Sequence, residues 1–97
     1  MIFIVDKIAK IEKHFKIEGK LFSKTRKGEV VRVRGCIWYY LRHEKKMKWS
    51  EIGRLFSKDH ASVIFISKKV SNALENPMYD PLIPETYNLI KNIFENE

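Results

Sequence analysis

The sequence predicts an all-α fold, a small bundle of helices that contains a helix-turn-helix. Apolar residues recur at intervals of three and four along most of the chain, which is the spacing of one buried helical face. At 97 residues and 44% apolar content, the chain can build one core and is too short for two. We therefore expect one domain over residues 1–97, with helices at about residues 3–17, 30–45, 50–56, 60–75 and 85–95.

The N-terminal third of the chain reads as a helix followed by a basic loop. Gly19 marks the end of the first expected helix, whose apolar stripe consists of Ile4, Ile8, Ile11 and Phe15. The segment SKTRKG at residues 23–28 is polar and basic and closes on glycine, so we expect it to be an exposed loop.

The second expected helix carries a longer apolar stripe, which consists of Val30, Val33, Ile37, Tyr40 and Leu41. Gly35 is a weak helix former that costs about 1 kcal/mol against alanine, so we expect a neighbouring helix to pack closely there. Trp38, Tyr39 and Tyr40 form an aromatic cluster. Such a cluster can stack nucleobases in a protein that binds single strands, but at this spacing we assign it to the core and its edge.

A helix-turn-helix is expected over residues 47–70, with its turn at residues 57–58. Ser50 is placed to cap the short first helix, and Trp49 precedes it as a hydrophobic staple. Gly53 would allow the next helix to approach closely. The buried face of the short helix consists of Ile52, Leu55 and Phe56.

Asp59 can cap the longer helix of the pair, and Asn76 with Pro77 stops it. Its buried stripe consists of Val63, Ile66 and Val70, together with Ile64 or Phe65. The C-terminal extension over residues 76–97 ends in a last helix, whose stripe consists of Tyr87, Ile90, Ile93 and Phe94. That helix either closes the bundle or forms a homodimer with a second copy.

Charge is distributed unevenly. The formal net charge is +7, and residues 1–74 carry 18 basic and 7 acidic side chains, whereas residues 75–97 carry 1 and 5. A basic body points to nucleic acid or an anionic membrane, and its plainer interpretation is a lysine-rich solvated surface. Cys36 is a lone cysteine, which excludes an intramolecular disulfide and a cysteine-based zinc site. No apolar stretch approaches the roughly 20 residues that cross a bilayer, so we expect a cytoplasmic protein associated with the nucleoid.

Asp59 and His60 are the most informative polar pair, and four interpretations compete. A metal site lacks further ligands at suitable spacing, and a catalytic dyad lacks a partnered nucleophile or a glycine-rich phosphate loop. A third interpretation makes Asp59 only a cap and His60 an exposed first-turn residue. In the fourth, the pair enters the major groove of DNA, where a carboxylate accepts from cytosine N4 and the methyl group of Ala61 meets a thymine methyl.

A family resemblance rests on three segments, SKTRKGEVVRVRGCIWYYLR, WSEIGRLF and KDHASVIFISKKV. Over about residues 3–75, the chain resembles the C-terminal DNA-binding domain of the bacterial chromosomal replication initiator DnaA. That domain has a basic loop after SK-x-R, a helix that begins Arg-Pro-Arg-Gln, a short helix around EIG, and a reading helix that begins Arg-Asp-His-Thr-Thr-Val. The resemblance implies a Trp-repressor-like helix-turn-helix. The initiator's ATPase and oligomerisation domains have no counterpart in this sequence, so we expect no enzymatic activity, no cofactor and no metal.

The resemblance also implies a role for individual residues. Arg26 would enter the minor groove, and the base contacts of the reading helix would come from Lys58, Asp59, His60, Ala61 and Ser62. Phosphate contacts would come from Lys24, Lys27, Arg32, Arg34, Lys68 and Lys69. Val33 and Gly35 replace the family's Pro and Gln, Ala61 lacks a hydroxyl, and the turn is one residue shorter. These departures leave the preferred DNA sequence open.

The leading hypothesis is a protein that binds double-stranded DNA at preferred, DnaA-box-like sites, as a replication accessory or transcriptional regulator. Phosphate neutralisation by five or six cations would make binding fall steeply with salt. The alternative is a protein-protein interaction or dimerisation module on the same scaffold, with Tyr87, Ile90 and Phe94 as an exposed apolar stripe of the last helix.

Overall fold

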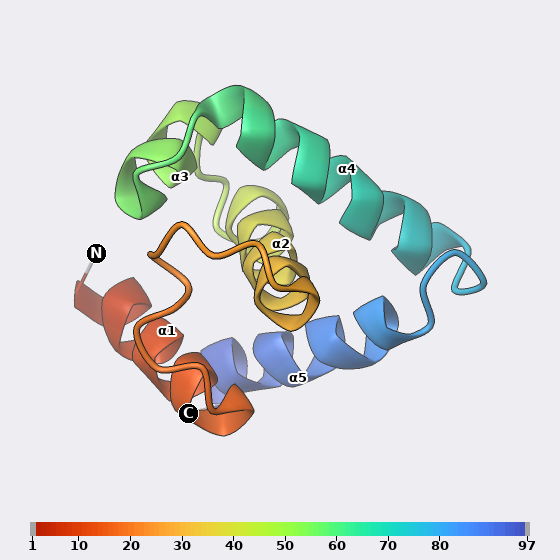
Figure 1. Ribbon diagram of the computed structural model, residues 1–97, viewed down its shortest axis with the longest axis horizontal. Helices are drawn as coiled ribbons and strands as arrows, with labels where there is room; N and C mark the ends of the chain where they lie inside the picture. Colours follow the sequence, from red (N-terminus) through yellow and green to blue (C-terminus); the bar gives the residue numbers. More distant parts are fainter. Residues whose placement is uncertain (1, 97) are drawn as a thin grey trace.

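The computed structural model describes residues 2–96, which form five helices, one of them central (Figure 1). They are α1 (Ile2–Phe15), α2 (Gly28–His43), α3 (Trp49–Phe56), α4 (His60–Glu75) and α5 (Leu82–Asn96). No strand occurs in this part of the chain, which confirms the predicted all-α fold. The two ends of the expected domain, residues 1 and 97, lie outside the described residues.

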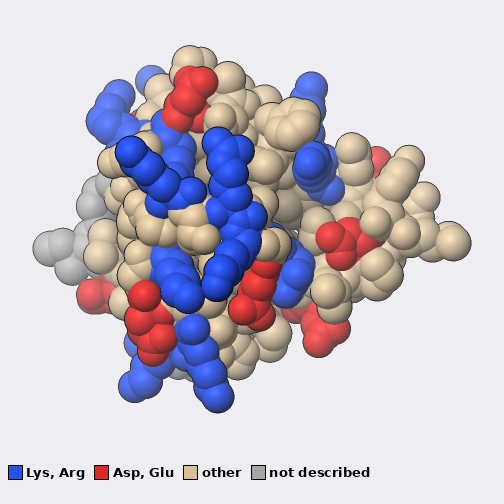
Figure 2. All heavy atoms as spheres, viewed as in Figure 1, with Lys and Arg blue, Asp and Glu red and all other residues tan. Residues whose placement is uncertain are grey.

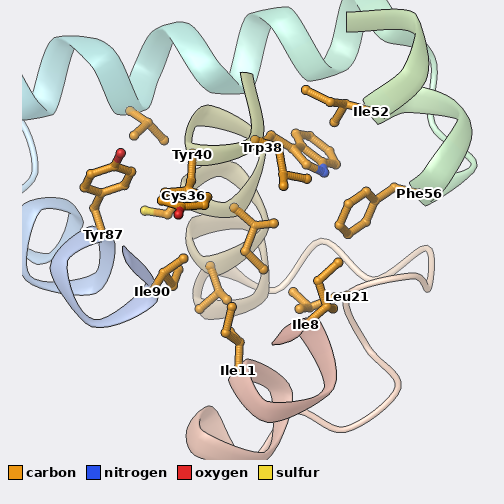
Figure 3. Packing of buried hydrophobic residues seen from close by; sticks show 14 of the residues in the cluster. Ile8, Ile11, Leu21, Cys36, Trp38, Tyr40, Ile52, Phe56, Tyr87 and Ile90 are labelled. Atoms are coloured by element: carbon orange, nitrogen blue, oxygen red, sulfur yellow. The ribbon is translucent and has the colours of Figure 1, made fainter. Parts of the chain in front are cut away.

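The central helix is α2, which packs against α4 on one side and α5 on the other (Figure 1). The side chains predicted for its stripe are at most 2% exposed. Figure 3 shows the core they share with Ile8 and Ile11 of α1, Ile52 and Phe56 of α3, and Tyr87 and Ile90 of α5. One contiguous core therefore fixes the positions of all the helices, including the two of the helix-turn-helix.

The aromatic cluster of α2 belongs to this core, as expected. Trp38 and Tyr40 are 2% and 1% exposed. The Trp38 Nε1 atom is buried without a hydrogen-bond acceptor in the described residues. Its ring instead meets Phe56 edge-on, with 5.6 Å between centroids and 79° between planes, and Figure 3 shows the nitrogen on the side facing Phe56. Trp38 is therefore held in the core by packing against an aromatic ring rather than by a hydrogen bond of its indole N–H.

At Gly35 the helices α2 and α4 approach each other closely. A Cβ atom at this position would lie 2.6 Å from Cγ2 of Ile66 and 3.2 Å from Cγ2 of Val70. The cost of glycine inside a helix is therefore offset by the close packing of these two helices, as the sequence predicts.

The start of α3 differs from the sequence prediction. Lys48 is the N-cap, because its backbone N–H donates to Oε1 of Glu51 at 2.8 Å and the helix begins at Trp49. Ser50 lies inside the first turn, so its predicted capping role is wrong. The carboxylate three residues after the cap fixes this helix start where no capping hydroxyl is used.

The last helix closes the bundle, which is the first of its two predicted roles, and the apolar stripe that the interaction-module alternative needs exposed is buried. Tyr87, Ile90 and Phe94 are 8%, 0% and 8% exposed, and Phe94 stacks on Tyr40 with 4.5 Å between ring centroids. The helix begins at Leu82, earlier than expected, because its N–H donates to Oδ1 of Asp80 at 3.1 Å. The stripe is apolar because α2 and α1 cover it within the same chain.

Candidate nucleic-acid interface

The turn between α3 and α4 is tight because Gly53 lets the chain pass directly over α3. Ser57 adopts a left-handed conformation with φ 55°, and the Lys58 N–H donates to the Gly53 carbonyl at 2.8 Å. A Cβ atom at Gly53 would lie 2.6 Å from the Lys58 carbonyl oxygen. This glycine therefore sets the spacing of the helix-turn-helix, as the sequence indicated.

The first turn of α4 presents its polar side chains to solvent. The Asp59 carboxylate accepts from the Ala61 N–H at 3.4 Å as the cap of the helix. The side chains of Asp59 and His60 are still 70% and 63% exposed, with 3.8 Å between Oδ1 and Nδ1. Ala61 and Ser62 are exposed beside them. The structure thus brings four of the predicted base-contact residues together on one accessible turn.

The basic loop borders the same face of α4. A groove with a volume of about 800 Å³ separates the loop from the helix. Its walls consist of Lys24, Thr25 and Arg26 from the loop, Val31, Arg34 and Trp38 from α2, Lys58 from the turn, and Ala61, Ser62, Phe65, Ile66 and Lys69 from α4. Lys24, Arg26 and Lys69 are exposed. Figure 2 shows basic side chains gathered over the middle of this view, whereas the projecting end at the α4–α5 turn carries acidic and uncharged ones.

Arg34 is not among the exposed cations with which the sequence analysis grouped it. It is 6% exposed, and its guanidinium donates to backbone carbonyls at 3.0 to 3.2 Å, those of Lys20, Leu21, Ser23 and Thr25. Burial lowers the pKa of Arg34 from 12.5. Four of its five N–H donors are used inside the chain, so it holds the loop rather than presenting its charge to a ligand.

Arg32 and Lys58 are also engaged within the chain. The Arg32 Nε donates to Oγ1 of Thr86 in α5 at 3.2 Å, and the residue is not part of the groove wall. The Lys58 Nζ donates to the Ser23 carbonyl of the loop at 2.7 Å. Burial, together with the charges of Arg34, Arg26 and Lys24, lowers the pKa of Lys58. The two outer cations of α4, Lys68 and Lys69, remain exposed.

Phe65 is a groove residue that the sequence analysis did not assign to the site. It is 59% exposed, and the Lys69 Nζ lies 4.9 Å from its ring centroid. The sequence left Phe65 and Ile64 as alternatives for the buried stripe. The spacing of Val63, Ile66 and Val70 could have predicted that Phe65 is exposed, because Phe65 lies off the helical face that these three residues define.

No three His, Cys, Asp or Glu side chains in the described residues are grouped so as to hold a metal ion. None of the helices between residues 2 and 96 has the length and apolar character needed to span a membrane. The Cys36 thiol is fully buried, and burial raises its pKa to about 12.

A tight turn between α3 and α4, a capped and accessible first turn of α4, and a basic loop beside it define a helix-turn-helix protein. Residues 5–70 match the family described as the bacterial DnaA protein helix-turn-helix. The chain belongs to this family.

Curated relatives with similar sequences are named as the chromosomal replication initiator protein DnaA. The chromosomal replication initiator protein DnaA of Mycoplasma genitalium is 39% identical over 56 residues, which are 58% of this chain and 13% of that protein. The protein of the same name from Bacteroides thetaiotaomicron is 33% identical over 91 residues, 90% of this chain and 19% of that protein. The chain thus spans less than a fifth of the length of these relatives. No solved structure gives a significant match.

Proposed function

We propose that this chain binds double-stranded DNA and prefers certain sequences. In this proposal the first turn of α4 enters the major groove and Arg26 enters the adjacent minor groove. The observation that carries it is the shared groove, which the basic loop borders on one side and α4 on the other. In DNA, one sugar-phosphate strand separates the major groove from the adjacent minor groove. That strand would lie in the groove of the protein, with α4 in the major groove on one side and the basic loop in the minor groove on the other.

The first turn of α4 supplies chemistry for direct readout. The Asp59 carboxylate accepts a hydrogen bond from a cytosine amine, His60 meets a base edge, and Ser62 can donate or accept. Ala61 offers a methyl group to thymine. Phe65, one turn further along, adds an exposed apolar ring to the same wall of the groove.

Phosphate contacts are proposed for the exposed cations that flank these readers, which are Lys24, Lys27, Lys68 and Lys69. Arg34 is left out because four of its five N–H donors bind loop carbonyls, and Arg32 is left out because it does not border the groove. Neutralising about four phosphates gives a slope of log affinity against log salt near −3.6, at about −0.9 for each contact.

A fluorescence anisotropy titration at about 50 mM salt tests the proposal, with a DnaA-box duplex and a scrambled duplex of equal length. Tighter binding to one duplex supports sequence preference, and equal binding reduces the proposal to DNA association. Absence of binding to both would refute it. Because the relatives are named as replication initiators, a role as a replication accessory or transcriptional regulator is part of the proposal.

Variants separate readers from phosphate contacts. Arg26→Ala and His60→Ala should each reduce discrimination between the two duplexes by about 1 to 3 kcal/mol, because each removes a base contact. Lys69→Ala should weaken both duplexes alike and lower the salt slope by about 0.9. Equal losses on both duplexes for all three variants would show that none of these residues reads bases.

A further inference from the structure

The basic loop and the helix-turn-helix meet at one carbonyl group, that of Ser23. Its oxygen accepts from the Lys58 Nζ at 2.7 Å and from the Arg34 Nη2 at 3.2 Å. One donor comes from the turn before α4 and the other from α2. The two lone pairs of the carbonyl are thereby used by cations from two different elements.

The loop depends on such side-chain donors for its conformation. Arg34 also binds the carbonyls of Lys20, Leu21 and Thr25, so the backbone of residues 20–25 wraps around its guanidinium. The hydrogen bonds that the loop makes within itself are short-range. The Ser23 N–H donates to Lys20 at 3.1 Å, and the Thr25 N–H donates to the Ser23 hydroxyl at 3.3 Å. Arg34 fixes the loop relative to α2, and among the described residues it makes no hydrogen bond to α4.

Lys58 is placed to make that second connection. It precedes the Asp59 cap of α4 by one residue, and its bond to Ser23 spans 35 positions of the sequence. Its ammonium lies among the charges of Arg34, Arg26 and Lys24, which repel it. A cation stays in such surroundings when a strong acceptor holds it, and a carbonyl at 2.7 Å is one.

We propose that Lys58 is a positioning residue, which acts through Ser23 to fix the basic loop at a set distance from the first turn of α4. This inference rests on the proposed DNA binding. A duplex presents its major and minor grooves at a fixed separation. A chain in which Arg26 and His60 already have that separation pays less ordering entropy on binding. Lys58 then contributes to affinity through preorganisation, in place of the base contact that the family resemblance implies.

Two variants of Lys58 and one matched lysine test this role. Lys58→Met keeps the length of the side chain and removes the donor, Lys58→Arg restores a charged donor, and Lys69→Met removes an exposed cation from the same groove. The first measurement is amide hydrogen exchange at Ser23 and Thr25 in the full chain without DNA. We expect exchange about tenfold faster in Lys58→Met, near the wild-type rate in Lys58→Arg, and unchanged in Lys69→Met.

The second measurement is the salt dependence of duplex binding for the same variants. Lys58→Met should lower affinity about tenfold with an unchanged slope, whereas Lys69→Met should reduce the slope by about 0.9. Unchanged exchange in Lys58→Met would overturn the inference. A slope reduced as in Lys69→Met would also overturn it and would make Lys58 a direct phosphate contact. If the wild-type chain binds no duplex, the proposed function fails, and the exchange rates still decide whether Lys58 holds the loop.

Discussion

Gly53 lies where the turn after α3 passes over that helix, and Gly53→Ala tests whether this close approach sets the position of α4. At a solvent-exposed position inside a helix, replacing glycine by alanine would stabilise the chain by about 1 kcal/mol. Here the new Cβ atom would lie 2.6 Å from the Lys58 carbonyl oxygen and 3.4 Å from the His60 nitrogen. Both neighbours are backbone atoms, and the Lys58 N–H is already bonded to Gly53, so neither can rotate away.

The expected effect of Gly53→Ala follows from setting these two contributions against each other. Overpacking costs about 1 to 3 kcal/mol, and a clash with backbone belongs at the upper end. After the gain in helix propensity is subtracted, the free energy of unfolding should fall by about 2 kcal/mol. For a domain of this size that is a loss of about 10 °C in Tm. DNA affinity should fall as well, because the displaced atoms include the first residue of α4.

Two further glycines serve as controls in urea denaturation and anisotropy titrations. Gly28→Ala adds a Cβ atom with no neighbour within 4 Å, so its stability should equal or exceed that of the wild type. Gly35→Ala meets the Cγ2 atoms of Ile66 and Val70, whose χ1 angles are restricted in a helix, so we expect a comparable loss of about 2 kcal/mol but little change in DNA affinity. The reasoning is refuted if Gly53→Ala is as stable as Gly28→Ala and binds DNA like the wild type.

Three other predictions concern the core and the titrating groups. Ile90→Ala should lower the free energy of unfolding, measured by urea denaturation, by about 2 to 5 kcal/mol, because Ile90 is fully buried. Leu89, which is 37% exposed, should tolerate alanine. Equal losses for the two variants would argue against the packing of α5. Burial, with the charges of Arg42 and Lys46, lowers the pKa of His43 from 6.5. The unfolded chain then binds this proton at higher pH, so stability should fall as pH drops below 6.5, and His43→Gln should flatten that dependence. The Cys36 thiol, whose pKa burial raises to about 12, should resist a thiol reagent at about pH 8 until denaturant is added, and rapid labelling of the native chain would contradict its burial.

Local pattern was enough to predict the helices and several of their details. The apolar stripe of α2, the packing role of Gly35 and the cap at Asp59 were each readable because they depend on residues three or four positions apart or on one residue type. Tyr40 falls within the predicted apolar stripe of α2. Trp38, two residues earlier, lies on a different side of the helix and is buried because Phe56 of α3 packs against it. The N-cap of α3 was missed because a backbone N–H bound to Glu51 needs no capping hydroxyl at the cap itself.

Arg32 and Arg34 are similar in sequence context and differ only in tertiary surroundings. Arg32 meets α5 and Arg34 is enclosed by loop carbonyls, although both belong to the basic start of α2. In the same way, an apolar stripe on α5 predicts burial without naming what covers it. The sequence gives no direct measure of which surface a given helical face will meet.

The sequence by itself determined the all-α class, the helix-turn-helix and the family, because these depend on spacings and motifs within short segments. Only the tertiary structure decided that α5 completes the core, that Phe65 borders the groove, and that Lys58 binds Ser23. The physical reason is that each of these depends on the meeting of segments far apart in the chain. Helical periodicity states which face is apolar, whereas the partner of a buried cation is set by where a distant carbonyl comes to lie.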